Sequence, residues 1–230
     1  MSISTAVIVA AGKGRRMGTE ISKQFLPLCG KEILAHTVEK FEKAACIRDI
    51  ILVTGKDALQ DVRQMAQEYG WKKIISVTEG GKERQDSVFL GLQQVPQDTE
   101  IVLIHDGVRP FVTEEILERS IAAAKETGGC VAGVPAKDTI KVCNADGFAI
   151  ATPDRSTLWQ MQTPQTVRRT ENLAAYEAAK ADGFLGTDDA SVAEHSGFPV
   201  RVIMGSYRNI KITTKEDLLI GAAFLKEETE

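Results

Sequence analysis

The sequence predicts an α/β protein built on a single doubly wound, mostly parallel sheet, with helices on both faces and a protruding β arm. Two observations carry this prediction. Short apolar runs rich in β-branched residues alternate with segments of helical periodicity along most of the chain, and continuous apolar strands are typical of a parallel sheet covered on both faces. The alternation fails in one polar stretch, residues 137–165, where the arm is expected.

The expected strands are apolar runs too short for a helix and bounded by Gly, Asp or Pro. They cover residues 6–9, 50–53, 74–77, 101–104, 131–134 and 200–203. The expected helices cover residues 33–41, 59–69, 87–92, 114–125 and 173–180. Thr113 precedes two glutamates, the pattern of an N-cap followed by a negatively charged first turn. In such a fold, ligands gather at the carboxyl ends of the strands.

The composition fits one globular unit over residues 1–230 and narrows the possible ligands. The chain is 43% hydrophobic and 26% charged, with a formal net charge of −4. Because a nucleic-acid-binding face normally carries a basic excess, no nucleic-acid partner is expected. The scattered cysteines argue against a zinc site or a disulfide framework and fit a reducing cytoplasm. The apolar stretch 6–11 is too short to span a membrane and lacks the basic segment that precedes a signal-peptide core.

The polar stretch 137–165 contains Asp, Asn, Gly, Thr and Pro residues that break any long periodicity. Two short strand-like pieces remain in it, residues 139–142 and 148–151, which indicate a hairpin-like arm. From composition alone, this arm is equally well a plain surface excursion or a dimerisation element.

The first expected strand runs into a glycine-rich turn with several cations, Ala10-Ala11-Gly12-Lys13-Gly14-Arg15-Arg16-Met17-Gly18. Glycines let backbone amides approach phosphate oxygens, and Lys and Arg neutralise the charge of a triphosphate. A plain strand-to-helix turn with solvated charges is the alternative. The spacing from Gly14 to Gly18 is one residue too long for the dinucleotide fingerprint, and the chain has no P-loop sequence. A dehydrogenase or a P-loop NTPase is therefore not expected.

Three more charged residues are candidates for the same site. Lys23 follows the turn closely enough to fold back over phosphates, unless it is a solvated surface Lys. Asp106 ends the strongest apolar run and could contact Mg²⁺ or a ribose, or simply form a turn. Lys211 lies in the apolar, strand-like run 209–213, where its charge needs an anionic partner. His105 has no evident acid–base partner and is expected to be structural.

Several separated blocks, in one order along nearly the whole chain, carry a specific resemblance. They are residues 10–17, Lys23-Gln24, Gly80-Gly81, residues 83–87, His105-Asp106, Arg109-Pro110, Asp138-Thr139, Asp154-Arg155, Leu158-Trp159, residues 162–165, Thr187-Asp188, Ala190-Ser191 and residues 209–211. With these blocks the chain resembles the 2-C-methyl-D-erythritol 4-phosphate cytidylyltransferase family of non-mevalonate isoprenoid synthesis. Val9 and Gly107 stand where that family often has Pro and Ala, and neither change removes a side chain that would take part in chemistry.

The resemblance implies a Rossmann-like nucleotidyltransferase fold and a Mg²⁺-dependent transfer of CMP from CTP to 2-C-methyl-D-erythritol 4-phosphate. It also implies a cytoplasmic homodimer in which the arm, at about residues 137–160, reaches the neighbour's site. The catalytic residues would be Arg16, Lys23, Arg155 and Lys211. Those around the nucleotide would be Ala10, Ala11, Gly12, Gly14, Gly80, Gly81, Ser87 and Asp106, with Asp106 also near the metal. Those around the acceptor would be Arg109, Thr139, Arg155, Thr163, Thr187 and Lys211.

Two other functions stay open at this point. Ribitol-5-phosphate cytidylyltransferase of cell-wall synthesis shares the glycine-rich turn and residues 162–165 and 209–211, whereas residues 154–159 and 186–191 favour the methylerythritol family. A non-catalytic nucleotide-binding module would keep the turn but could lose the catalytic cations outside it, and this chain has them all.

Overall fold

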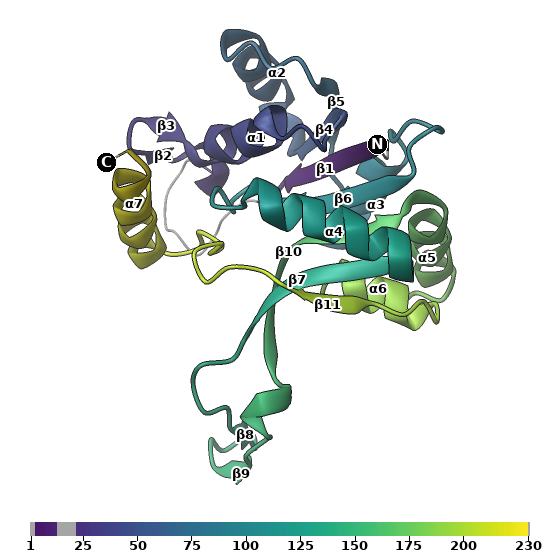
Figure 1. The fold of residues 1–230 in the computed structure, drawn as a ribbon, viewed down its shortest axis with the longest axis vertical. Coiled ribbons are helices and arrows are strands. Elements are labelled where there is room, and N and C mark those ends of the chain that lie inside the picture. The colour runs from purple at the N-terminus through teal and green to yellow at the C-terminus, as the bar shows by residue number, and fades with distance from the viewer. Residues whose placement is uncertain (1–2, 13–21, 230) are drawn as a thin grey trace.

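Seven strands form one mostly parallel sheet in the computed structural model, which describes residues 3–12 and 22–229 (Figure 1). Their order across the sheet is β11-β7-β10-β6-β1-β4-β5. The strands are β1 (Ser4–Ala10), β4 (Asp49–Thr54), β5 (Ile74–Glu79), β6 (Ile101–Asp106), β7 (Gly129–Pro135), β10 (Trp159–Arg168) and β11 (Arg201–Met204). Among these strands, β10 is the one that runs antiparallel to its neighbours, β6 and β7. The predicted α/β class is confirmed.

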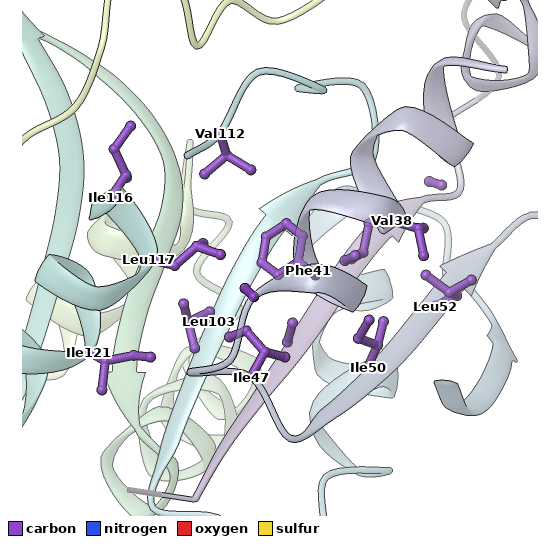
Figure 2. Packing of buried hydrophobic residues seen from close by; sticks show 14 of the residues in the cluster. Val38, Phe41, Ile47, Ile50, Leu52, Leu103, Val112, Ile116, Leu117 and Ile121 are labelled. Carbon is purple, nitrogen blue, oxygen red and sulfur yellow. The ribbon is translucent and has the colours of Figure 1, made fainter. Parts of the chain in front are cut away.

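Helices cover both faces of this sheet. One face carries α1 (Ile33–Lys43), α2 (Leu59–Glu68) and α4 (Glu114–Thr127), and the other carries α3 (Arg84–Leu92), α5 (Arg169–Ala181) and α6 (Asp189–His195). Successive strand residues point to opposite faces, so each strand contributes to two cores. In the first core, Phe41 of α1 and Leu117 of α4 lie beside Leu103 of β6 (Figure 2). Val7 of β1 and Val53 of β4 belong to the second.

The helix α7 (Lys215–Thr229) packs on loops at the carboxyl edge of the sheet. Its Leu218 and Phe224 contact a third buried cluster, which includes Val108 and Ile212. The ring of Phe224 also meets that of Phe111 edge-on, with centroids 5.4 Å apart. This helix therefore supports the segments that follow β6 and β11.

An arm leaves the sheet after β7 and returns as β10 (Figure 1). A hairpin of β8 (Val142–Cys143) and β9 (Ala149–Ala151) forms the tip of the arm, and η4 (Arg155–Thr157) follows it. The short elements elsewhere in the described chain are η2 (Lys23–Phe25), β2 (Pro27–Leu28), β3 (Lys31–Glu32) and η3 (Lys56–Ala58). Phe148 and Ile150 are 71% and 64% exposed in the β8–β9 hairpin, since it has no core of its own. The protruding β arm is thus confirmed, with strand pairing limited to its tip.

The arm ends earlier than residue 165. Residues 159–165 belong to β10, which pairs with β7 at Trp159–Met161 and with both β7 and β6 from Gln165 on, so assigning the whole stretch to the arm was wrong. The strand was not recognised because several of its residues, including Gln162, Thr163 and Gln165, are polar. Pro164 lies where the register of β10 against β7 shifts between Met161 and Gln165, an irregularity at which Pro is tolerated.

A second correction concerns residues 209–213, which read as strand-like but form no strand. The segment is irregular, and the backbone N–H of Ile212 donates to the carbonyl of Val108 at 2.9 Å. In the arm, residues 139–141 are not paired as a strand, which begins at Val142. The helices α6 and α7 were not predicted.

The other predicted strands and helices are confirmed, with ends shifted by a few residues. α3 begins at Arg84, and α4 begins after Thr113 as expected, although the Thr113 side chain makes no capping hydrogen bond. Within the described chain, no helix combines the length and the apolar character needed to cross a membrane.

Candidate active site

A pocket opens at the carboxyl ends of β1 and β6, the edge at which ligands of such sheets gather. It has a volume of about 160 Å³ and adjoins a larger hollow of about 880 Å³ near η3. The pocket is lined by Val9, Ala10, Ala11, Gly12, Lys23, Gln24, Gly81, Lys82, Glu83, Arg84, Ser87, Asp106, Val108 and Lys211. Segments far apart in the sequence therefore meet in one place, and most residues expected around the nucleotide are among them.

Lys23 reaches the pocket because the short helix η2 is tied to the end of β1. The buried side chain of Gln24 donates from Nε2 to the carbonyl oxygen of Ala10 at 2.7 Å. This bond fixes the residue beside Lys23 against the strand from which Ala11 and Gly12 continue. Arg16 and Gly14, which the sequence also places at this site, lie outside the described residues.

The glycines after β5 allow close approach of two backbones. A Cβ on Gly80 would stand 2.5 Å from the Cβ of Ala11 and 2.7 Å from Oγ of Ser87, so only glycine fits there without displacement. The N–H of Gly81 donates to Oγ of Ser87 at 3.1 Å, and that hydroxyl donates to the carbonyl of Glu83 at 3.0 Å. Because its single proton is used in this way, Ser87 can meet a ligand as an acceptor.

Asp106 is the residue on which the cations of the pocket converge. One carboxylate oxygen lies 3.3 Å from Nε of Arg84, and the other lies 3.1 Å from Nε of Arg109 and 3.0 Å from Nζ of Lys211. Burial alone would raise the pKa of this carboxyl, but Lys211, Arg84 and Arg109 hold it well below its usual range. Asp106 is therefore ionised, and it is the anionic partner that Lys211 was expected to need.

His105 and Thr163 support Asp106 from inside the protein. Nδ1 of His105 is 2.9 Å from Oγ1 of Thr163, and Nε2 is 3.1 Å from the carbonyl of Arg109. Burial lowers the pKa of His105 to about 4, so its ring is neutral and donates from Nε2. The N–H of Asp106 donates to Thr163 at 3.1 Å. These contacts agree with a structural role for His105. They also engage the hydroxyl of Thr163, which is buried and faces His105 and the backbone of Asp106.

The residues expected around the acceptor are only partly brought together. Arg109 donates to Asp106 and, at 2.8 Å, to the carbonyl of Asn209. Thr187 is exposed in the loop before α6. Thr139 and Arg155 are exposed on the arm, where Arg155 donates to the carbonyl of Lys137 at 2.9 Å. None of these four expected residues lines the pocket of its own chain.

Sequence reasoning missed Arg84 as a site residue, although it stands in one of the family-like blocks. Arg84 faces Asp106, and its two terminal nitrogens donate to the carboxylate of Asp189 at 2.8 and 2.7 Å. A charge in the first turn of a helix that follows a Gly-Gly pair was the available signal.

The described residues do not form a metal site by themselves, so a magnesium ion would have to be held mainly by its substrate. They contain no group of three or more His, Cys, Asp or Glu side chains arranged for a metal. Asp106 is a carboxylate at the pocket, and Mg²⁺ commonly takes one or two carboxylates together with substrate phosphates and water. Asp106 could therefore be the protein's ligand to such an ion.

Gly12 just after β1, clustered cations and the buried carboxylate of Asp106 lie together at the carboxyl edge of this sheet, an arrangement that fits a nucleotidyltransferase-type α/β protein. A family model described as 2-C-methyl-D-erythritol 4-phosphate cytidylyltransferase matches residues 4–227. The chain belongs to that family, so the resemblance seen in the sequence is confirmed.

Individual relatives and solved structures agree. The protein of that name from Alkaliphilus oremlandii is 47% identical over 231 residues, which cover 100% of this chain and 98% of the relative. The one from Geotalea uraniireducens is 50% identical over 225 residues and 96% of each chain. The crystal structure of 4-diphosphocytidyl-2C-methyl-D-erythritol synthase from Anaerococcus prevotii matches with a TM-score of 0.87 and 32% identity, over 98% of this chain and 96% of that one.

Proposed function

We propose that this protein transfers CMP from CTP to 2-C-methyl-D-erythritol 4-phosphate in non-mevalonate isoprenoid synthesis, with Mg²⁺, and releases pyrophosphate. The proposal depends on the meeting of Lys23, Asp106 and Lys211 beside Ala11 and Gly12, which follow β1, in a chain of this family. Four free cysteines support a place in the reducing cytoplasm.

The chemistry needs no covalent nucleophile from the protein. A phosphate oxygen of the acceptor attacks the α-phosphorus of CTP, the bond from that phosphorus to the bridging oxygen breaks, and pyrophosphate leaves with the electron pair. Catalysis then consists of positioning and charge neutralisation. Lys23 and Arg16 would offset the charge of the triphosphate and of the departing pyrophosphate, while Lys211 and Arg155 would aim the acceptor phosphate.

A bound Mg²⁺ would neutralise phosphate charge beside Asp106. Lys211, whose side chain is 36% exposed while it pairs with Asp106, can reach a phosphate that enters the pocket. Asp106 is ionised before substrate binds, because Lys211, Arg84 and Arg109 hold its pKa well below its usual range.

The base site favours cytosine through Ser87. Its hydroxyl proton is committed to Glu83, so it would accept a hydrogen bond from an exocyclic amine and would face the carbonyl of uracil with a lone pair. The backbone around Gly81 would supply the remaining contacts.

We further propose a homodimer with shared active sites. Arg155 and Thr139 stand exposed on an arm that projects from the sheet (Figure 1) and do not line the pocket of their own chain. In a two-fold dimer each arm would complete the other subunit's acceptor site, giving two equivalent composite sites.

The acceptor is tested by measuring pyrophosphate release from CTP with 2-C-methyl-D-erythritol 4-phosphate and, separately, with ribitol 5-phosphate. Release with the methylerythritol compound, at least about 100-fold faster than with ribitol 5-phosphate, is expected because the acceptor's binding energy is used in the transition state. Release with ribitol 5-phosphate alone would contradict the proposed substrate. CTP binding without turnover on either would indicate a non-catalytic module.

A further inference from the structure

A chain of buried and partly buried polar contacts runs from α5 to the pocket. The hydroxyl of Tyr176 donates to one oxygen of Asp189, and both oxygens of Asp189 accept from the guanidinium of Arg84 at 2.8 and 2.7 Å. Nε of the same guanidinium faces Asp106 at 3.3 Å. The side chain of Asp189 is 1% exposed and Tyr176 is 2% exposed. Arg84 therefore joins an interior carboxylate to the carboxylate of the pocket.

Asp189 is itself held in place by its surroundings. It is the first residue of α6, whose N-cap Asp188 forms a capping box with Ser191. Gln165 of β10 donates to the Asp188 side chain at 2.9 Å and accepts from the N–H of Ala190 at 2.7 Å. The residues on both sides of Asp189 are thus anchored, and its carboxylate is presented to Arg84 from a fixed position.

Asp189 also balances the charges around Asp106. Three cations converge on Asp106, and only Arg84 among them has a second carboxylate as a partner in the contacts described for these residues. Burial alone would lower the pKa of Arg84, but Asp189 and then Asp106 raise it above its ordinary value. The guanidinium of Arg84 donates to Asp189 through both terminal nitrogens, so it cannot turn away from Asp106 without breaking this bidentate pair.

We propose that Asp189, oriented by Tyr176, is a positioning residue that fixes Arg84 and thereby the carboxylate of Asp106 for the reaction. The inference rests on the proposed function of the pocket. A purely structural ion pair between α3 and α6 would stabilise the fold but leave turnover unchanged, and this difference can be measured.

The test is a double-mutant cycle with Arg84→Lys, Asp189→Asn and the double variant, read as kcat, KM for CTP and thermal midpoint. Each single change is expected to lower kcat by about 10-fold or more, because small displacements of reacting groups are costly. The double variant should be little worse than the poorer single one, since both changes break one unit. The matched control is the exposed bidentate pair of Arg48 and Asp98, with contacts of 2.6 and 2.9 Å. Arg48→Lys and Asp98→Asn should leave kcat within about twofold of the parent.

If Asp189→Asn does not fold, Tyr176→Phe tests the same contacts. This change removes the hydroxyl and keeps the ring that stacks on Phe89, and it should lower kcat by about two- to fivefold in folded protein. Unchanged kcat in Tyr176→Phe, or losses in the cycle that multiply independently, would overturn the inference. A parent that binds CTP but releases no pyrophosphate would refute the proposed function instead. In that case the dissociation constant of CTP would be measured for the same variants. Independent effects of Arg84→Lys and Asp189→Asn on that constant would overturn the positioning role.

Discussion

Asp106 concentrates the electrostatics of the pocket, since one carboxylate is shared by three cations from three parts of the chain. An arrangement of this kind holds the cations in place before a phosphate arrives, so less reorganisation is needed during the reaction. Lys211 is the most exposed of them and is the one best placed to be drawn to a substrate phosphate.

At the residue scale, Lys23→Ala is expected to fold normally and to lose about 100-fold or more in turnover. The side chain is only partly buried, so it contributes little to the core, whereas removing a well-placed transition-state contact costs on this scale. Steady-state kcat beside a urea unfolding curve checks both parts. The matched control is Lys56→Ala on the rim of the adjoining hollow. Turnover of Lys23→Ala within about threefold of the parent would exclude a catalytic role.

His105 gives a prediction on pH and stability. Its folded-state pKa is lowered to about 4 from an ordinary 6.5, so between these values the unfolded chain binds the extra proton. Stability from this group is therefore complete above about pH 6.5 and is lost as the pH falls toward 4. From pH 7 to pH 5 the free energy of unfolding should fall by about 2 kcal/mol through His105.

Urea unfolding of the parent and of His105→Gln at both pH values measures this loss. Gln keeps an amide donor and acceptor but does not titrate, so the variant's decrease between pH 7 and pH 5 should be smaller by that amount. Equal decreases in parent and variant would contradict a buried neutral histidine.

Part of the candidate site could be predicted from local sequence patterns. Local patterns were enough to assign Lys23, Asp106 and Lys211 to one site. Lys23 follows the glycine-rich turn, Asp106 ends an apolar strand, and Lys211 carries a charge within an apolar run. Arg84 was missed because its partners, Asp106 and Asp189, lie 22 and 105 residues away in the chain, and only the fold brings them together.

At the scale of elements, periodicity identified the apolar strands and the amphipathic helices but missed β10. This strand contains the buried polar residues Gln162, Thr163 and Gln165. They form hydrogen bonds with Ser206, His105 and Ala190 respectively, instead of packing as apolar side chains. The helix α7 was not predicted because its apolar residues do not lie on one buried face: Leu218 packs, partly buried, against the third core, whereas Leu219 is 75% exposed. Neither β10 nor α7 therefore shows the regular spacing of apolar residues that identifies a strand or a helix.

The start of α7 is expected to matter for the segment that carries Lys211. Oδ2 of Asp217 accepts from N and Oγ1 of Thr213 and from N of Thr214 at 2.8, 2.9 and 2.9 Å. Asp217→Ala should lower the free energy of unfolding by about 1 kcal/mol, the usual value of a helix N-terminal cap, and should lower kcat severalfold by loosening Lys211.

Asp217→Asn retains one acceptor oxygen and serves as the matched control, with an intermediate loss expected in urea unfolding and in kcat. If Asp217→Ala lost stability with unchanged kcat, the helix would support the fold without positioning Lys211.

At the scale of the whole molecule, the pocket contains most of the residues proposed for the nucleotide, while Arg155 lies on the arm and does not line it. Mixing Lys23→Ala with Arg155→Ala, each nearly inactive alone, tests whether the two residues act across a dimer. With shared sites, one site of a mixed dimer collects both changes and the other has neither, so random mixing should restore about a quarter of parental activity.

Subunit exchange is confirmed separately by native mass spectrometry of differently tagged subunits, and each variant mixed with itself is the control. If exchange occurs and no activity returns, both residues act within one subunit and the shared-site arrangement is wrong.

Attack of the acceptor on the α-phosphorus of CTP can be followed with labelled CTP. CTP carrying ³²P in the α-position, or in a parallel reaction in the γ-position, is incubated with the enzyme, Mg²⁺ and 2-C-methyl-D-erythritol 4-phosphate. Nucleotidyl transfer predicts that the α-label joins the acceptor, as part of a cytidine diphosphate ester of the acceptor, and that the γ-label is released as pyrophosphate. Transfer of γ-label to the acceptor would show attack at the terminal phosphate and would contradict nucleotidyl transfer.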